Sequence, residues 1–197
     1  EERAGDMRTL NFELEKPMYF RAGQYVTVGC KIGGSDVSRP YAISSAPKAA
    51  LEKKISVTVK KCGFFSEYLC EQAKVGDEFL IGDPSGDFCY EGARDASLVV
   101  ACAGGSGITP FYSMAQAIAD GTENFSLVIF CGDKKESDIA FRKELDALAC
   151  DKIKVVYVLS DEKKEGFEHG FITAELIQKY VPQKDFTLMM CGPGAMY

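Results

Sequence analysis

The sequence predicts a chain of two domains, an antiparallel β domain over residues 1–93 and an α/β domain with a parallel sheet over residues 94–197. In the first half, short segments of alternating apolar and polar residues are separated by Gly, Pro and Ser, as is typical of antiparallel strands. In the second half, near-continuous apolar runs are separated by stretches of helix length, which indicates parallel strands covered on both faces. A single α+β domain is the alternative, and it does not explain this change of pattern.

The first domain is expected to be an antiparallel sheet or barrel with one embedded helix. The helix covers Ser66–Gln72 and begins shortly after Gly63, and the stretch Gly86–Asp95 is the expected hinge to the second domain. The strands are expected at Gln24–Val28, Tyr41–Ser44, Ile55–Lys61 and Glu78–Ile81.

The second domain is expected to alternate strands and helices. The strands are expected at Leu98–Ala103, Ser126–Cys131, Lys154–Leu159 and Phe186–Cys191. The helices are expected at Pro110–Ala119, Asp138–Leu148 and Thr173–Tyr180. Ligands of open α/β sheets bind outside the carboxyl ends of the strands, so the turns that follow the strands are the places to look for binding residues.

Composition and charge exclude several classes of protein. The net charge is −6 at pH 7, whereas a nucleic-acid-binding protein needs a basic contact face. No apolar run approaches the roughly 20 residues that cross a bilayer, so membrane insertion is not expected, and no export signal is visible. Eight cysteines without a CxxC pair, and a single histidine, predict free thiols in a reducing, cytoplasmic compartment and no metal site.

Two glycine-rich turns follow strands of the expected parallel sheet. Residues 103–110 (AGGSGITP) come after the first strand and open a helix, whose exposed amides favour a pyrophosphate. Residues 191–196 (CGPGAM) leave the fourth strand and should face the same crevice. Each turn by itself also fits a tight connection without a ligand, and a buried free cysteine is ordinary core packing. Two such turns at one edge favour a dinucleotide.

Two further motifs lie in the first domain. Residues 39–45 (RPYAISS) place Arg39 and Tyr41 on one face of a strand, where they would form a phosphate clamp beside an aromatic platform. Residues 63–66 (GFFS) precede the helix, and its first amides with the Ser66 hydroxyl would bind an anion. The plain alternatives are a surface arginine on an exposed strand and ordinary N-capping by Ser66.

Together, the four motifs resemble the ferredoxin–NADP reductase superfamily, whose order is RxY(S/T), Gly-x-x-Ser, GGxGxTP and CGP. This sequence has RPYA, GFFS, GGSGITP and CGPGAM in that order between residues 39 and 196. The segment Gly23–Tyr25 resembles the family's GQY strand, and residues 75–77 and 82–88 resemble its domain-linking stretch. The resemblance implies a flavin-binding antiparallel β-barrel over 1–93 and a Rossmann-like NAD(P)-binding domain over 94–197.

The resemblance also implies roles for individual residues. Tyr41 and Cys191 are the candidate catalytic residues, because Tyr41 would lie against the flavin ring and Cys191 where the nicotinamide meets the flavin. Arg39 would hold a flavin phosphate. The other implied flavin-binding residues are Ala42, Ser44, Gly63, Phe65 and Ser66, and the other implied nucleotide-binding residues are Gly105, Gly107, Thr109, Gly192 and Pro193.

Two departures from the family pattern stand out. Ala42 replaces the family's usual hydroxyl residue, so a hydrogen bond toward the reactive edge of the flavin is missing and slower hydride transfer is expected. The chain begins after the family's first barrel strand and ends at Tyr197, before a closing helix and strand, as expected of part of a longer protein. A 2Fe–2S cluster is expected only in a domain outside this sequence, if at all.

The choice of nucleotide depends on residues 132–135, at the end of the second parallel strand. Asp133 would bind ribose hydroxyls and repel a 2′-phosphate, whereas Lys134 and Lys135 would attract one. All three could equally be solvated turn charges, so NADH and NADPH both stay open. His169 lies in a polar stretch and is expected in a surface loop.

The expected function is that of an NAD(P)H-dependent flavoprotein reductase of the ferredoxin reductase type, with FAD preferred over FMN by the habit of the family. Hydride would pass from NAD(P)H to the bound flavin, and single electrons would leave to a protein acceptor such as ferredoxin, flavodoxin or an iron–sulfur domain. The alternative is a flavin- and nucleotide-binding module that relays electrons or regulates a partner without turning over NAD(P)H. Ala42 is the residue that favours this alternative.

Overall fold

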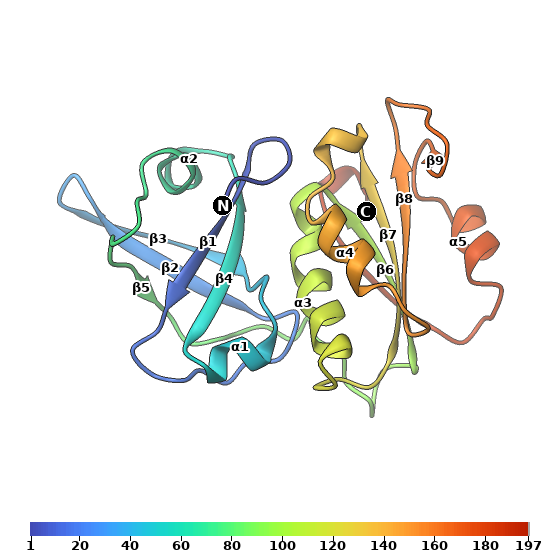
Figure 1. Cartoon of the computed structure of the whole chain (residues 1–197), viewed down its shortest axis with the longest axis horizontal. Coiled ribbons are helices and arrows are strands. Elements are labelled where there is room, and N and C mark those ends of the chain that lie inside the picture. The colour runs from blue at the N-terminus through green and yellow to red at the C-terminus, as the bar shows by residue number, and fades with distance from the viewer. Residues whose placement is uncertain (197) are drawn as a thin grey trace.

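A computed structural model describes residues 1–196 of the chain. A β domain and an α/β domain lie side by side (Figure 1). The β domain contains β1 (Met7–Glu13), β2 (Tyr25–Ile32), β3 (Ser35–Ala42), α1 (Pro47–Leu51), β4 (Lys54–Lys60), α2 (Phe64–Glu71) and β5 (Leu80–Ile81). The α/β domain contains β6 (Leu98–Gly104), α3 (Ile108–Ala119), β7 (Ser126–Asp133), α4 (Arg142–Leu148), β8 (Ile153–Leu159), β9 (Glu168–His169), α5 (Ala174–Tyr180) and β10 (Thr187–Cys191), with short 3-10 turns at Gly105–Gly107, Glu136–Asp138 and Gly194–Met196.

The strands of the β domain are divided between two antiparallel sheets. β1 pairs with β4, and the second sheet has the order β3-β2-β5. A bridge between Ile43 and Val57 joins the two sheets, and both pack on a core that includes Val26, Val28 and Leu69. The antiparallel β domain is therefore confirmed, with two sheets as its wall, but it contains two helices, α1 and α2, where one was expected.

The α/β domain contains a five-stranded parallel sheet with the order β10-β6-β7-β8-β9. Helices α3 and α4 cover one face of this sheet, and α5 covers the other (Figure 1). Residues 99–104 of β6 are all buried, as expected of a central strand with a helix layer on each side. The expected Rossmann-like arrangement is confirmed. Because β10 and β6 are neighbours, the turns that follow them lie next to each other at one edge.

Several strands of the β domain differ from the sequence-based expectation. β2 continues past Val28 to Ile32, and β5 covers only Leu80–Ile81. The local pattern does not reveal β1, in which polar side chains surround the apolar ones, yet every residue of β1 pairs with one of β4. The strand expected at Tyr41–Ser44 ends earlier and starts at Ser35, after a turn in which Gly33 and Gly34 have left-handed backbone conformations. Long-range pairing with β2 therefore defines this strand more than its own alternation does.

The helices are close to their expected positions, with one exception. The helix expected from Asp138 begins at Arg142, because Phe141 has φ +59° and interrupts the helical backbone. Thr173 accepts a hydrogen bond from the backbone nitrogen of Leu176 and so caps α5 where the sequence expects that helix to begin. The short elements α1 and β9 have no clear signal in the local pattern.

The expected hinge Gly86–Asp95 packs against the α/β domain. The ring of Phe88 meets that of Phe111 edge-on at 5.6 Å, and the ring of Tyr90 stacks on Phe125 at 4.2 Å. These contacts belong to the core of the α/β domain. The boundary between residues 93 and 94 stays a prediction, since the preceding residues already pack with the second domain.

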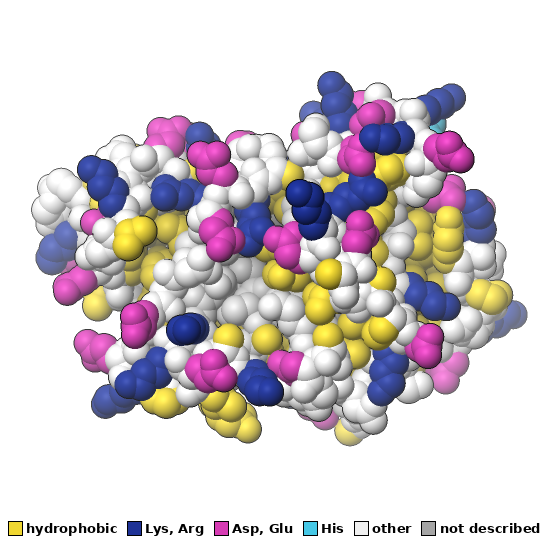
Figure 2. All heavy atoms as spheres, in the orientation of Figure 1, with side chains coloured by type: hydrophobic (Ala, Val, Ile, Leu, Met, Phe, Trp, Pro, Cys, Tyr) yellow, Lys and Arg dark blue, Asp and Glu magenta, His cyan; other side chains and the backbone are white. Residues whose placement is uncertain are grey.

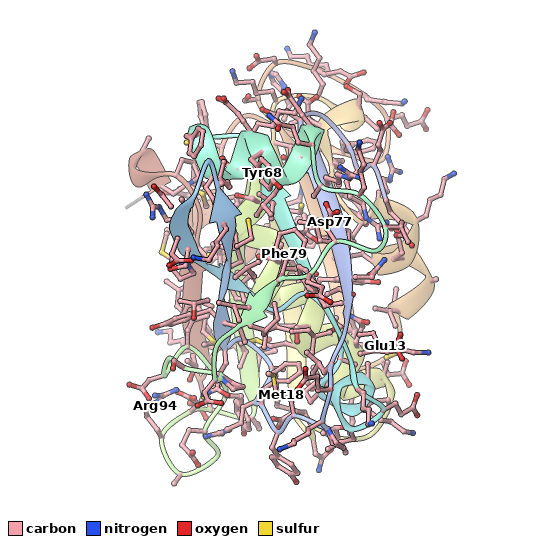
Figure 3. The ribbon with its side chains drawn as sticks, turned by 90° about the vertical axis from the view of Figure 1, so that its left-hand side faces the viewer. Glu13, Met18, Tyr68, Asp77, Phe79 and Arg94 are labelled. Atoms are coloured by element: carbon pink, nitrogen blue, oxygen red, sulfur yellow. The ribbon has the colours of Figure 1, made fainter. Side chains whose placement is uncertain are left out.

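Viewed from the outer side of the β domain, Tyr68 of α2 and Arg94 of the linker lie at opposite ends (Figure 3). The linker therefore leaves the β domain far from the GFFS motif that begins α2. Acidic and basic side chains are interspersed over the face in Figure 2, without a large area of one sign. No helix within residues 1–196 is both long and apolar enough to cross a bilayer.

Candidate functional site

The two glycine-rich turns lie against each other at the carboxyl edge of the parallel sheet. Cys191 at the end of β10 pairs with Ala103 near the end of β6. A Cβ atom on Gly107 would overlap the carbonyl oxygen of Cys191 and lie 2.9 Å from the backbone nitrogen of Gly192, so only glycine allows this approach. The two turns therefore meet at one edge of the sheet, as expected, and the ligand crevice that they would face stays a prediction.

Gly105 differs from Gly107 because the space beside it is open. Its φ is +53°, and the nearest atom to an added Cβ would be Nζ of Lys60, at 3.9 Å. Gly105 is therefore the part of the turn that a ligand could approach. Gly107 allows the two turns to pack together, and its contact with a nucleotide stays a prediction.

Lys60 is a candidate binding residue that the sequence analysis does not single out. It ends β4 in the β domain, yet its Nζ lies near Gly105 of the α/β domain. Burial raises the pKa of Asp133, at the end of β7, and the charge of Lys60 opposes this rise. Nζ of Lys60 also lies 3.8 Å from Oδ1 of Asp6. Nζ of the next residue, Lys61, instead lies 2.9 Å from Oε1 of Glu71. The only signal in the sequence is a strand that ends in two lysines just before the GFFS motif.

The other residues of the two turns are packed inside the edge. Thr109 is buried, and its Oγ1 donates to the carbonyl oxygen of Ser106 at 3.0 Å. A Cβ on Gly104 would lie 2.8 Å from Cδ of Pro193 and 3.6 Å from Cα of Gly192. These residues shape the crevice, and a direct contact of Thr109, Gly192 or Pro193 with a nucleotide stays a prediction.

Cys191 is the last residue of β10, at the carboxyl edge of the sheet, and its thiol is half-buried. Burial raises the pKa of the thiol, so it is protonated at neutral pH. A protonated thiol is a poor nucleophile, which favours a role in shaping the site over covalent catalysis.

Asp133, the last residue of β7, and Lys134, which follows it, have opposite environments. Lys134 is exposed, whereas burial raises the pKa of the Asp133 carboxyl to about 7. The Cys131 thiol lies 3.4 Å from Oδ2 of Asp133, and the charge of Asp138 raises the pKa further. The acidic side chain therefore faces the sheet edge, and the basic one faces the solvent.

Arg39, Tyr41 and Phe65 bring the two motifs of the β domain together. Arg39 is exposed on β3, and its Nη1 donates to the carbonyl oxygen of Ser38 at 2.7 Å, which leaves its other N–H groups for an anion. Burial raises the pKa of the half-buried Tyr41 to about 12, and the nearby Arg39 charge opposes this. The ring of Tyr41 lies 6.5 Å from that of Phe65 on α2.

At the start of α2 the backbone at Gly63 is accessible, whereas the hydroxyl of Ser66 is already hydrogen-bonded. Nothing lies within 4 Å of an added Cβ at Gly63, whose φ is +100°. The Ser66 hydroxyl accepts from the backbone nitrogen of Cys62 at 2.7 Å and donates to the carbonyl oxygen of Gly63 at 2.8 Å. The hydroxyl proton of Ser66 is therefore used within the turn, and the backbone amides are the donors that remain for an anion.

Ser44 and Ala42 offer little to a flavin in this arrangement. Ser44 is 1% exposed, and its Oγ lies 3.0 Å from Oγ1 of Thr58 in the interior. Ala42 pairs with Tyr25 across the sheet and has no hydrogen-bonding side chain. Direct contact of either residue with a flavin stays a prediction.

The groups that remain open fit two phosphate-bearing ligands. On the β domain they are the guanidinium of Arg39 and the backbone at Gly63, which suit the diphosphate of FAD. At the crevice they are the backbone at Gly105 and Lys60, whose exposed Nζ faces Asp6 at 3.8 Å, and these suit the diphosphate of a nicotinamide dinucleotide. Because Lys60 belongs to the β domain, the second ligand would be held between the two domains.

Comparison with known proteins agrees with this division. A model of the oxidoreductase FAD-binding domain matches residues 1–90, and a model of the oxidoreductase NAD-binding domain matches residues 102–197. NADH-cytochrome b5 reductase 1 of Lodderomyces elongisporus is 34% identical over 182 residues, which cover 88% of this chain and 60% of that protein. The glycine betaine monooxygenase reductase subunit of Chromohalobacter salexigens is 32% identical over 200 residues, which cover 95% of this chain and 53% of that protein.

The fold is also found in a solved structure. A ferredoxin NADP+ reductase from Neisseria gonorrhoeae with bound FAD and NADP matches with a TM-score of 0.82 at 22% identity, over 97% of this chain and 81% of that one. The chain spans less than two thirds of the length of the two curated relatives. From its two matched domain models and its shared fold, the chain belongs to the ferredoxin–NADP reductase superfamily of FAD- and NAD-binding oxidoreductases.

Proposed function

We propose that the chain is the reductase module of a flavoprotein that takes hydride from NADH and passes single electrons to a protein acceptor. One observation carries this proposal. Lys60, from the domain that holds Arg39 and Gly63, lies beside Gly105 in the nucleotide turn of the other domain. A nucleotide held at Gly105 would thus lie where the two domains meet, within reach of a flavin on the first.

FAD, when bound, would supply the redox chemistry, because a flavin accepts two electrons together and releases them one at a time. The residues of this chain would bind and orient. Arg39 and the backbone at Gly63 would hold the flavin diphosphate, and the ring of Tyr41 would lie against the flavin. Cys191 would limit how far the nicotinamide enters the crevice.

Positioning is the main catalytic contribution in this proposal. Ala42 has no hydroxyl, and burial raises the pKa of the Cys191 thiol, so neither residue is a proton donor suited to neutral pH. Hydride transfer depends on the close approach of two rings, and a misplacement of about 1 Å can cost on the order of a hundredfold in rate. The contact between the two glycine turns would set that approach.

NADH is the proposed nucleotide. Asp133 and Asp138 lie close enough at the end of β7 for the charge of Asp138 to raise the pKa of Asp133. A 2′-phosphate would place a further negative group beside these carboxyls, whereas ribose hydroxyls would find hydrogen-bond acceptors there. NADH also stands in the name of one relative, NADH-cytochrome b5 reductase 1.

The proposed acceptor is a one-electron carrier protein. The relatives carry the names of a cytochrome b5 reductase and of a monooxygenase reductase subunit, which supports an acceptor of the haem or iron–sulfur class. Ferredoxin and flavodoxin are the alternatives within the same class of reaction.

A binding module without turnover is the second candidate function, and Ala42 is the observation that favours it. Rapid mixing of the flavin-loaded whole protein with NADH, and separately with NADPH, distinguishes the two. We expect the flavin absorbance to bleach with NADH at lower concentration than with NADPH. Nucleotide binding without bleaching would support the module instead, and a protein that stays colourless with added FAD or FMN would contradict both.

A further inference from the structure

A chain of hydrogen bonds through buried hydroxyl groups leads from Arg3 to Ser44, which follows the RPYA motif. The Nε of Arg3 donates to Oγ1 of Thr9 at 2.8 Å. Oγ1 of Thr9 lies 2.9 Å from Oγ1 of Thr58, which in turn lies 3.0 Å from Oγ of Ser44. The three hydroxyl residues are at most 5% exposed. Buried polar groups are held in one geometry when they are all hydrogen-bonded, so this chain is a rigid element of the β domain.

The same arginine reaches the α/β domain. Its guanidinium lies over the ring of Phe141 at 4.7 Å from the centroid, and Nη1 pairs with the carboxylate of Glu144 on α4. The side chain of Arg3 is only 18% exposed, so these contacts are shielded from solvent. A single residue near the start of the chain therefore binds both domains.

Phe141 is held in an unusual conformation by these contacts. Its φ of +59° is disfavoured for a bulky side chain, and such a conformation persists only where packing determines it. The ring is 3% exposed and lies between the Arg3 guanidinium and the ring of Tyr112, which stacks on it at 4.2 Å. The position of Tyr112 on α3 is thereby tied to Arg3.

Two residues of α3, Ser113 and Gln116, form hydrogen bonds with the β domain. Nε2 of Gln116 donates to the carbonyl oxygen of Tyr112 at 3.1 Å and to that of Ser44 at 2.8 Å. Oγ of Ser113 donates to the carbonyl oxygen of Ser45 at 2.7 Å. Arg3, Thr9, Thr58, Ser44, Gln116, Tyr112 and Phe141 thus form a closed ring of contacts that crosses the domain boundary twice, which we call the interdomain ring.

We propose that Arg3 is a positioning residue, which sets the orientation of the nucleotide turn relative to the flavin strand through the interdomain ring. This inference rests on the proposed function. α3 begins at Ile108, directly after the glycine turn, so a shift of α3 moves the turn with it. Ser44 follows Tyr41 by three residues on the flavin side. The side chains of Arg3 and Gln116 each touch both domains, and without Arg3 the ring is open.

Arg3→Ala in the whole protein tests this role, with Arg8→Ala as the matched control. Arg8 lies in the same segment, but its Nη1 donates to the carbonyl oxygen of Cys70 at 2.9 Å, within the β domain. At equal flavin content, we expect Arg3→Ala to lower the limiting rate of flavin reduction by NADH on the order of tenfold, with a smaller change in the NADH concentration for half-maximal rate. Arg8→Ala should keep the parent rate. An Arg3→Ala protein that reduces its flavin as fast as the parent overturns the proposal, whatever its thermal stability.

Amide hydrogen exchange supplies a readout that needs no nucleotide. In Arg3→Ala we expect faster exchange at residues 44–45 and 112–116, on both sides of the boundary, and no such change in Arg8→Ala. If the parent itself is not reduced by NADH, the proposed function fails and the exchange result alone decides the role of Arg3. Unchanged exchange in both segments overturns it.

Arg3→Lys provides a milder variant for both measurements if Arg3→Ala does not fold. Lysine keeps a positive charge for Glu144 but has neither the Nε donor for Thr9 nor a flat face for Phe141. We expect it to slow flavin reduction and to accelerate exchange in the same two segments, each by less than alanine does. A lysine variant with parent rate and parent exchange overturns the proposal.

Discussion

The backbones of Gly107 and Cys191 approach each other closely, although 83 residues lie between them in the chain (residues 108–190). A side chain on Gly107 would overlap the carbonyl oxygen of Cys191, and backbone atoms cannot rotate away as a flexible side chain can. The turns after β6 and β10 therefore behave as one unit.

Gly107→Ala should show how tightly this unit is built. We expect a loss of unfolding free energy of at least about 1–3 kcal/mol, because an overpacked site must shift its backbone. Gly194→Ala is the control, since nothing lies within 4 Å of an added Cβ there. Urea denaturation of the two variants checks this, and equal stabilities would contradict the contact.

Cys191→Ala should keep its flavin and reduce it more slowly. The thiol lies in the α/β domain at the crevice, where about 1 Å of nicotinamide misplacement can cost on the order of a hundredfold in rate. Rapid mixing with NADH measures the rate. Cys102→Ala, buried in the neighbouring strand β6, should lower thermal stability without altering the rate per folded molecule. If Cys191→Ala behaves like Cys102→Ala, the residue is core packing only.

Arg39→Ala should weaken flavin binding about tenfold to a hundredfold, because a charge-assisted hydrogen bond to a phosphate contributes roughly 1.5–3 kcal/mol. Fluorescence titration of the apoprotein with FAD measures the affinity. Lys31→Ala is the control on the same sheet, since Lys31 pairs with Asp36 at 3.2 Å on the surface. An unchanged FAD affinity in Arg39→Ala would show that the guanidinium holds no flavin phosphate.

Lys60→Ala and Lys61→Ala should differ although the residues are adjacent. Lys60 lies beside Gly105, so its loss is expected to weaken NADH binding about tenfold, as for one charge-assisted contact. Lys61 pairs with Glu71 at 2.9 Å, so its loss should leave NADH binding unchanged. The concentration of NADH for half-maximal flavin reduction provides the measurement. Equal effects of the two substitutions would argue for a diffuse charge effect in place of a defined contact.

The unfolding free energy of Asp133→Asn, relative to that of the parent, should increase as the pH rises. Burial raises the pKa of Asp133 from 3.8 to about 7, so the folded protein holds a proton that the unfolded chain releases at lower pH. The stability from this proton is fully present below pH ~4 and is lost as the pH rises toward pH ~7. The asparagine variant avoids that loss. We expect the difference in unfolding free energy between variant and parent to favour the variant by on the order of 1–3 kcal/mol more at pH 8 than at pH 4. Urea denaturation at both pH values tests this, and a pH-independent difference would count against a buried acid.

Local patterns were enough to predict the division into two kinds of domain and the order of the binding motifs. The run Leu98–Ala103 is apolar throughout and becomes an inner strand of a parallel sheet, because a strand buried on both faces leaves no place for polar residues. The glycine turn and helix after it follow from backbone freedom and from Pro110 in the first helical turn, both of which are local properties. β1 is less regular, and its pairing with β4 organises it.

Which residues of the motifs face a ligand was decided by the tertiary structure. The space beside Gly105 is open because only the end of a lysine from β4 lies near it. The space beside Gly107 is filled by the backbone at the end of β10. The Ser44 hydroxyl turns inward because Thr58 lies across the sheet junction. Arg3 meets Glu144 only after both domains have folded. Each of these contacts joins residues far apart in the chain, and periodicity and motif spacing describe only neighbours, so long-range packing alone selects the partners.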